Sequence, residues 1–210
     1  MRRSLATFLL SATTLAALTI QAAGPATASP ATRSAPSDTV ITATYPVTGS
    51  TFISKLNSTI ALGPGTLVSS LDLQTSALTA TLTLPPATGS FTILGFVPVT
   101  ATTEFIQDGM ATGTLKNGVV TTTAQVTLKL TSLKAAGIPI FVGNQCETNT
   151  PATITITSQA GFNLLNGGNL AGTYTIPRFS HCGLATLLIN LTIPGPNNTI
   201  TLTLGKAKIG

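Results

Sequence analysis

The chain has 210 residues, of which 43% are hydrophobic, 7% charged and 5% aromatic, and its formal net charge is +5. Ordinary soluble domains contain about 25% charged residues, so this composition excludes a disordered chain, a coiled coil and a polyelectrolyte binder. The basic residues are scattered along the sequence, whereas a nucleic-acid interface needs a clustered basic face. Nucleic acid is therefore not an expected partner.

The first 28 residues have the pattern of a secretory signal peptide. Arg2 and Arg3 provide a short positive start, residues 5–20 are apolar and uncharged, and residues 26–28 (Ala-Thr-Ala) fit a cleavage site. An uncleaved anchor fits less well, because a membrane-spanning helix needs about 20 apolar residues. We therefore expect a secreted protein, extracellular or associated with the cell wall, with no membrane span after cleavage.

The rest of the chain divides into a leader and one domain. Residues 29–38 are rich in proline and serine and lack apolar periodicity, which predicts a flexible leader. Residues 39–210 are enough for one domain with a sizeable core and too few for two ordinary domains. We expect a single β domain in this range.

Alternation of apolar residues with threonine recurs along the domain. In residues 77–84, Leu78, Ala80, Leu82 and Leu84 alternate with threonines, and a period of two places successive side chains on opposite faces of a strand. The chain has 41 threonines, and this β-branched residue offers a hydroxyl to water, so threonine replaces the usual charged outer face. Further strands are predicted at 40–47, 97–106, 122–130, 152–157, 170–176, 187–193 and 199–204.

Turn signals separate these runs and indicate the fold class. Asn117-Gly118 lies between two of them and predicts a type I′ hairpin turn. Helix is expected only at 132–136 and, as a short turn, at 66–71. The pattern predicts an all-β fold, an antiparallel β-sandwich or barrel of about eight or more strands. A transmembrane barrel is disfavoured, because such barrels carry aromatic girdles and this chain has two tyrosines and no tryptophan.

Cys146 and Cys182 are the only cysteines. In an exported chain an even pair predicts a disulfide, which would close a long loop and stabilise the fold. The alternatives are a metal site shared with His181 or a reactive thiol. Two sulfurs and one imidazole lack a fourth ligand and have no CxxC-type spacing, so no metal site is predicted.

Several stretches are apolar on both faces of the expected strands, notably 91–99, 138–142 and 184–193. Buried core strands would explain them, and so would a pocket or an exposed face for a hydrophobic ligand, lined by aliphatic and aromatic side chains with few polar anchors. The candidate pocket residues are Phe91, Phe96, Phe105, Phe141, Phe162 and Phe179.

Motifs with catalytic content are missing from the sequence, which has no GxSxG, HExxH, SxxK or phosphate-cradling GxxxxGK[ST] pattern. His181 is the only imidazole, and most mechanisms need two or three converging acid, base or nucleophilic groups. We therefore predict a protein that is not an enzyme and has no catalytic residue, metal or cofactor. A hydrolase would require His181 to converge with at least one of Asp72, Glu104, Asp108 and Glu147.

The Arg-Arg start, the Ala/Thr/Pro-rich leader, the sequence Phe-Val-Pro-Val-Thr-Ala-Thr at 96–102 and the two late cysteines resemble small secreted all-β proteins of high-GC actinobacteria. The resemblance covers most of the domain, contains no diagnostic motif and implies export or association with the cell envelope. It transfers no catalytic residue to this chain.

These observations lead to three hypotheses of function. The first is a secreted or cell-envelope binding protein that holds a hydrophobic or lipid-like ligand. The second is a structural or adhesive surface protein that has no small-molecule ligand and contacts other envelope components. The third is a hydrolase. The sequence leaves open the oligomeric state and the choice between a solid core and a pocket.

Overall fold

The computed structural model describes residues 39–93 and 95–210. The expected signal peptide (1–28) and leader (29–38) lie outside the described residues. Strands make up most of the described part of the chain. These are β1 (Val40–Ile53), β2 (Ser58–Asp72), β3 (Ala77–Thr83), β4 (Ala87–Ile93), β5 (Val97–Gln107), β6 (Ala111–Lys116), β7 (Val119–Ala135), β8 (Ile138–Ile140), β9 (Glu147–Thr148), β10 (Ala152–Ser158), β11 (Gly168–Ile176), β12 (Phe179–Ser180), β13 (Gly195–Leu204) and β14 (Lys208–Ile209).

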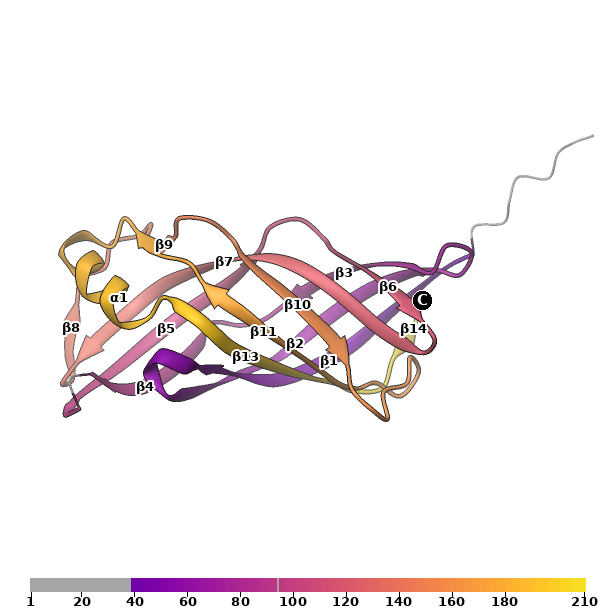
Figure 1. Cartoon of the computed structure of the whole chain (residues 1–210), viewed down its shortest axis with the longest axis horizontal. Coiled ribbons are helices and arrows are strands. Elements are labelled where there is room, and N and C mark those ends of the chain that lie inside the picture. Colours follow the sequence, from indigo (N-terminus) through magenta and orange to yellow (C-terminus); the bar gives the residue numbers. More distant parts are fainter. Residues whose placement is uncertain (1–38, 94) are drawn as a thin grey trace, which may run out of the picture. The chain divides into compact units, whose positions relative to one another are not determined.

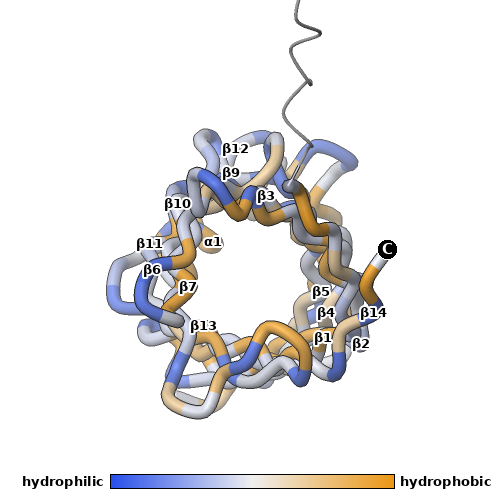
Figure 2. The backbone as a smooth tube through the Cα atoms, turned by 90° about the vertical axis from the view of Figure 1, so that its right-hand side faces the viewer, coloured by the Kyte–Doolittle hydropathy of each residue, from blue (hydrophilic) through white to orange (hydrophobic). Residues whose placement is uncertain are grey.

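Eight of these strands close into an antiparallel barrel (Figure 1). Neighbours pair in the order β10, β11, β13, β1, β2, β3, β6 and β7, and β7 pairs with β10 to complete the circle. Seen from one end, the strands form a ring (Figure 2). The predicted all-β antiparallel fold is confirmed, and of the two predicted architectures the chain adopts the barrel.

The alternation found in the sequence determines which side chains of the barrel wall face the interior and which face solvent. In β13, Ile200, Leu202 and Leu204 are buried, and the intervening threonines are exposed. The outward threonines also align across strands, since the pairing places five of them directly opposite one another on five neighbouring strands: Thr112, Thr123, Thr155, Thr173 and Thr199. Threonine thus provides both the β propensity and the polar outer surface.

The predicted β6–β7 hairpin is also confirmed. Lys116 pairs with Val119 across a two-residue turn. Asn117 has a φ of 51° and Gly118 a φ of 79°. A type I′ turn requires positive φ at both central residues, which asparagine and glycine tolerate best.

Three predicted elements are wrong. Residues 187–193, expected as a strand, belong to the helix α1 (Thr186–Thr192) and its C-cap. This segment is apolar nearly throughout, and periodicity alone cannot distinguish a buried strand from a helix in such a run. Conversely, residues 132–136 and 66–71 were expected as helix, but 132–135 lie in β7 and 66–71 in β2. Pairing with neighbouring strands on both edges overrides the local helical preference.

One end of the barrel, here called the capped end, is closed by α1, the preceding 3-10 helix η2 (Gly183–Ala185), β8 and the paired strands β9 and β12 (Figure 1). The predicted disulfide between Cys146 and Cys182 is confirmed, and both residues are fully buried. Asn190 of α1 adds a clamp on Phe179, with 2.7 Å from the Phe179 amide nitrogen to its Oδ1 and 2.8 Å from its Nδ2 to the Phe179 carbonyl. These contacts fix α1 onto the barrel.

The opposite end, here called the loop end, carries the β10–β11 connection (residues 159–167). Phe162 and Leu164 of this connection pack against a small cluster of buried side chains: Leu71, Leu78, Ala80, Ala111 and Val120. The Tyr45 hydroxyl donates a 2.7 Å hydrogen bond to the Leu164 carbonyl and ties the connection to β1. Side chains therefore pack at both ends of the barrel.

Candidate functional site

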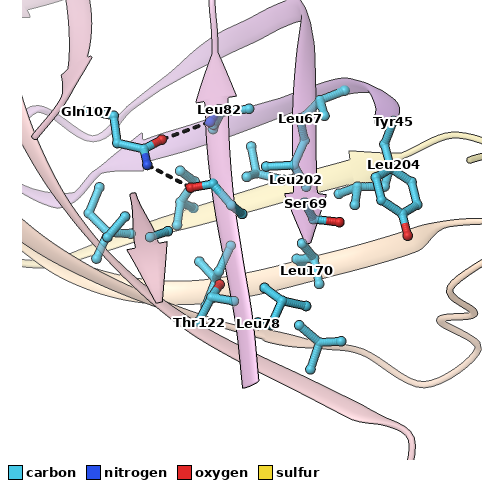
Figure 3. Close-up of a pocket in the computed structure, with 18 of the residues that line it drawn as sticks. Tyr45, Leu67, Ser69, Leu78, Leu82, Gln107, Thr122, Leu170, Leu202 and Leu204 are labelled. Carbon is cyan, nitrogen blue, oxygen red and sulfur yellow. Dashed lines mark hydrogen bonds between the residues drawn. The ribbon is translucent and has the colours of Figure 1, made fainter. Parts of the chain in front are cut away.

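A cavity of about 100 Å³ lies inside the barrel (Figure 3). Its walls come from all eight barrel strands, with additional side chains from β5 and the β10–β11 connection. One buried water needs about 10–15 Å³ by a comparable measure, so the space exceeds that of a few waters. An eight-stranded barrel is just wide enough either to be filled by side chains or to hold one small ligand, and this barrel is incompletely filled.

Most of the cavity wall is aliphatic, because the inward positions of the barrel strands are Leu, Val, Ile and Ala. Four polar side chains also line it, and Figure 3 shows them among the leucines: Tyr45, Ser69, Gln107 and Thr122. An apolar wall with a few polar groups is the usual composition of a site for a hydrophobic molecule.

Burial has raised the pKa of Tyr45, and a hydrogen bond with Ser69 offsets part of this effect. Its hydroxyl therefore stays protonated at neutral pH, donating to Leu164. No described charged side chain lines the cavity. The site is consequently suited to a neutral or alkyl group rather than to an ion.

At the level of this cavity the barrel wall has a break between β3 and β5. The pairing of β3 with β6 ends at Ala80 opposite Ala111, and the pairing of β4 with β5 starts at Ala87 opposite Thr103. Between these points, residues 81–86 face residues 104–110 without a strand ladder. Two prolines, at positions 85 and 86, lack an amide hydrogen and could not donate to one.

The side chain of Gln107 bridges the break (Figure 3). Its Oε1 accepts a 2.8 Å hydrogen bond from the Leu82 amide, and its Nε2 donates to the carbonyls of Ala80 at 2.9 Å and Gly109 at 2.8 Å. The side-chain amide thus takes the place of a backbone peptide of the missing ladder. Leu82, Leu84 and Phe105 line the cavity around it and are only partly buried.

The six phenylalanines predicted to line a pocket have separate locations. Phe105 and Phe162 line the barrel cavity. Phe91 borders a smaller cavity of about 20 Å³ beneath α1, and Phe179 is buried in the main core. Phe96, in the β4–β5 turn, and Phe141, after β8, are exposed and line neither cavity. Both lie in connections, where inward and outward positions no longer alternate as they do along a strand.

The six predicted phenylalanines did not identify most of the cavity wall, because the wall consists mainly of aliphatic rather than aromatic side chains. Gln107 was also missed, although the sequence contains a signal for it. Val97, Val99, Ala101 and Phe105 occupy inward positions of one alternating run, and Gln107 continues that run with a polar residue. A polar side chain at an inward position usually has a specific partner, and here the partners are Ala80 and Leu82.

The groups considered for acid-base chemistry lie mostly in separate places. Nδ1 of the exposed His181 is 3.1 Å from the Ser180 hydroxyl oxygen. Glu104 on β5 is 3.9 Å from Lys129, Asp108 accepts from the Thr127 hydroxyl, and Asp72 caps the turn after β2. Glu147 lies on β9 and pairs with Ser180. Within residues 39–93 and 95–210, no three His, Cys, Asp or Glu side chains group as a metal site would require.

The described part of the chain contains no helix that is long and apolar enough to cross a membrane. Comparison with protein-family models, curated proteins and solved structures finds no match. The geometry of the chain itself therefore carries the functional argument.

Proposed function

We propose that the protein is a secreted or cell-envelope binding protein that holds one slim hydrophobic molecule inside its barrel. The observation that carries the proposal is the apolar cavity, which borders both the main core cluster and the cluster at the loop end. A space of about 100 Å³ suits one alkyl chain or a small ring, and the hydroxyls of Tyr45, Ser69 and Thr122 provide anchors for a single polar group.

The break beside Gln107 provides the route into the cavity. Side chains of α1 pack into the core at the capped end, and Phe162 and Leu164 pack at the loop end, whereas at the break two hydrogen bonds from one side chain hold β3 and β5 together. The exposed apolar residues Ile106 and Met110 flank Gln107 in the sequence. An apolar ligand would therefore meet apolar side chains outside the break, at its rim and inside the barrel.

The test is isothermal titration calorimetry with benzene and with 1-pentanol, two neutral molecules that match the cavity in size. The cavity-filling variant is Ala124→Leu, because Ala124 faces the cavity from β7. The matched control is Ala171→Leu, because Ala171 follows the inward Leu170 on β11 and faces outward. We expect saturable binding, weakened by about tenfold or more in Ala124→Leu, which corresponds to about 1.4 kcal/mol or more, and unchanged in Ala171→Leu.

Absence of saturable binding, or an equal effect of both variants, would contradict the proposal. The fold of both variants is checked by circular dichroism, so that loss of binding is not confused with unfolding. Two further neutral ligands, 1-butanol and 1-hexanol, test the length of chain that the cavity accepts.

The second candidate function is a structural or adhesive role at the cell surface. The outward threonines that align across β6, β7, β10, β11 and β13 favour it. An open groove of about 700 Å³ on the outer face, lined by residues that include Thr153, Thr173 and Asn197, also favours it. This role predicts retention in the cell-wall fraction independently of the cavity. Fractionation of cells expressing the Ala124→Leu variant separates the two functions, since only adhesion would survive.

A further inference from the structure

The capped end of the barrel exposes a group of large apolar side chains to solvent. Each is between 64% and 103% exposed. They come from the β4–β5 turn, from β8 and the residue after it, and from η2 and α1, which lie at the same end of the barrel in Figure 1. The six side chains, here called the apolar tip, are Phe96, Ile138, Phe141, Leu184, Leu187 and Leu191.

The apolar tip rests on a fixed base. On the other face of α1, Ile189 and the C-cap residue Ile193 are buried in the main core. Leu188 shares the small cavity beneath α1 with Ile140 of β8, so the two segments pack together. With the buried disulfide and the Asn190 clamp, this packing holds the apolar side chains outward. Their exposure is therefore built into the fold rather than due to a loose segment.

The charges around the apolar tip are mainly positive. The segments that form this end, residues 54–57, 95–100, 131–143, 147–148 and 177–196, contain Lys55, Lys134 and Arg178, all exposed, and a single carboxylate, Glu147 of β9, which lies opposite Lys129 of β7. Lys134 lies on β7 opposite Pro139 of β8, and the Lys55 ammonium lies 3.3 Å from the Pro194 carbonyl just after α1.

An exposed apolar surface flanked by cations complements a membrane with anionic headgroups. Leucine and phenylalanine side chains lower their free energy by entering the boundary between headgroups and acyl chains, while nearby lysine and arginine side chains approach the phosphates. We propose that the apolar tip docks the protein on an anionic lipid surface. This docking goes beyond the proposed ligand binding and does not depend on the barrel cavity.

The experiment is co-sedimentation of the mature protein with vesicles of phosphatidylcholine alone and of phosphatidylcholine mixed with phosphatidylglycerol. We expect binding to the mixed vesicles that decreases as salt is added, since screening weakens the attraction to headgroups. The variant Leu187→Gln with Leu191→Gln keeps a good helix former at both positions of α1 and should lower the partition coefficient by about tenfold or more. Lys134→Gln should lower it by about fivefold on the mixed vesicles only.

The matched control is Leu165→Gln with Ile209→Gln, which removes two exposed apolar side chains from the loop end and should bind as the wild type does. Phe141→Ser provides a second tip variant outside the helix, which covers the case that the α1 variant fails to fold. Ala124→Leu should bind vesicles normally, so failure of cavity binding and failure of docking are distinguishable.

No binding of the wild type to either vesicle would overturn the proposal, as would an equal loss in the loop-end control. Light scattering after gel filtration measures the oligomeric state and tests whether the apolar tip is instead a dimer interface. A dimer that the Leu187→Gln, Leu191→Gln variant converts to a monomer would show that a second copy, not a lipid surface, covers the apolar tip.

Discussion

The side chain of Gln107 is hydrogen-bonded to the backbone of Leu82, with 2.8 Å between Oε1 and the amide nitrogen, across a break in the barrel wall. A second hydrogen bond, from Nε2 to the Ala80 carbonyl, means that both the oxygen and the nitrogen of the Gln107 amide group contact β3. One side chain thus replaces a stretch of strand ladder at the level of the cavity. We expect both the stability of the barrel and access to its interior to depend on this contact.

Replacing Gln107 with leucine should open the break locally. The Leu82 amide and the Ala80 carbonyl would lose their partner, which costs about 1–2 kcal/mol of unfolding free energy. Hydrogen exchange followed by NMR should show faster exchange at Leu82 than at Leu78, which pairs within the β3–β6 ladder. Gln125→Leu is the control, because the Gln125 side chain is exposed and accepts a hydrogen bond from the Thr153 hydroxyl at the barrel surface. Unchanged exchange at Leu82 would show that Gln107 does not hold the break closed.

The same contact should control the rate at which a probe enters and leaves. In Gln107→Ala, NMR line-shape analysis of benzene exchange should give faster association and faster release, while Kd changes little, because the cavity wall is otherwise intact. A mutation that alters both rates equally changes the barrier and not the bound state. If the rates stay at the wild-type values while the probe still binds, entry occurs elsewhere, and the loop at residues 159–167 is the next place to test.

Alternation with threonine was sufficient to predict most of the barrel strands and their orientation. It was insufficient for α1, because residues 187–193 are apolar nearly throughout, and only tertiary packing shows that Ile189 faces inward while Leu187 and Leu191 do not. The cavity could not be predicted, since the same aliphatic residues would fill a solid core. Whether they leave space depends on the barrel diameter, which is set by the number and stagger of the paired strands.

The disulfide should contribute strongly to stability. Its sequence separation of 36 residues corresponds, in the chain-entropy model, to about 3.5–4 kcal/mol. The double variant Cys146→Ser, Cys182→Ser should therefore unfold at a lower urea concentration, with the capped end losing hydrogen-exchange protection first. Thr131→Ser, on the exposed face of β7, is the control. An unchanged midpoint would mean that packing around α1 suffices without the bond.

Alkaline pH should destabilise the protein through its tyrosines. Burial raises the pKa of Tyr174 above its ordinary value of 10.0, and a bond with the Thr51 hydroxyl offsets part of the shift. The Tyr174 hydroxyl loses its proton at about pH 10 in the unfolded chain and only at a higher pH in the folded chain. The free energy of unfolding therefore decreases as the pH rises from about 10 to the raised pKa. Tyr45 acts in the same direction.

Urea titrations over this pH range, with phenolate absorbance followed in parallel, measure the effect. The Tyr174→Phe variant should be less sensitive to alkaline pH than the wild type. An equal dependence in both proteins would mean that Tyr174 does not contribute to the alkaline loss.

The central claim is that the barrel cavity holds a hydrophobic molecule, and native mass spectrometry of protein purified from an exporting host tests it most directly. The account predicts a one-to-one adduct that disappears after solvent extraction, returns when the extract is added back and is absent from Ala124→Leu but present in Ala171→Leu. A wild-type spectrum that shows only the bare protein, before extraction and after addition of the extract, would contradict it.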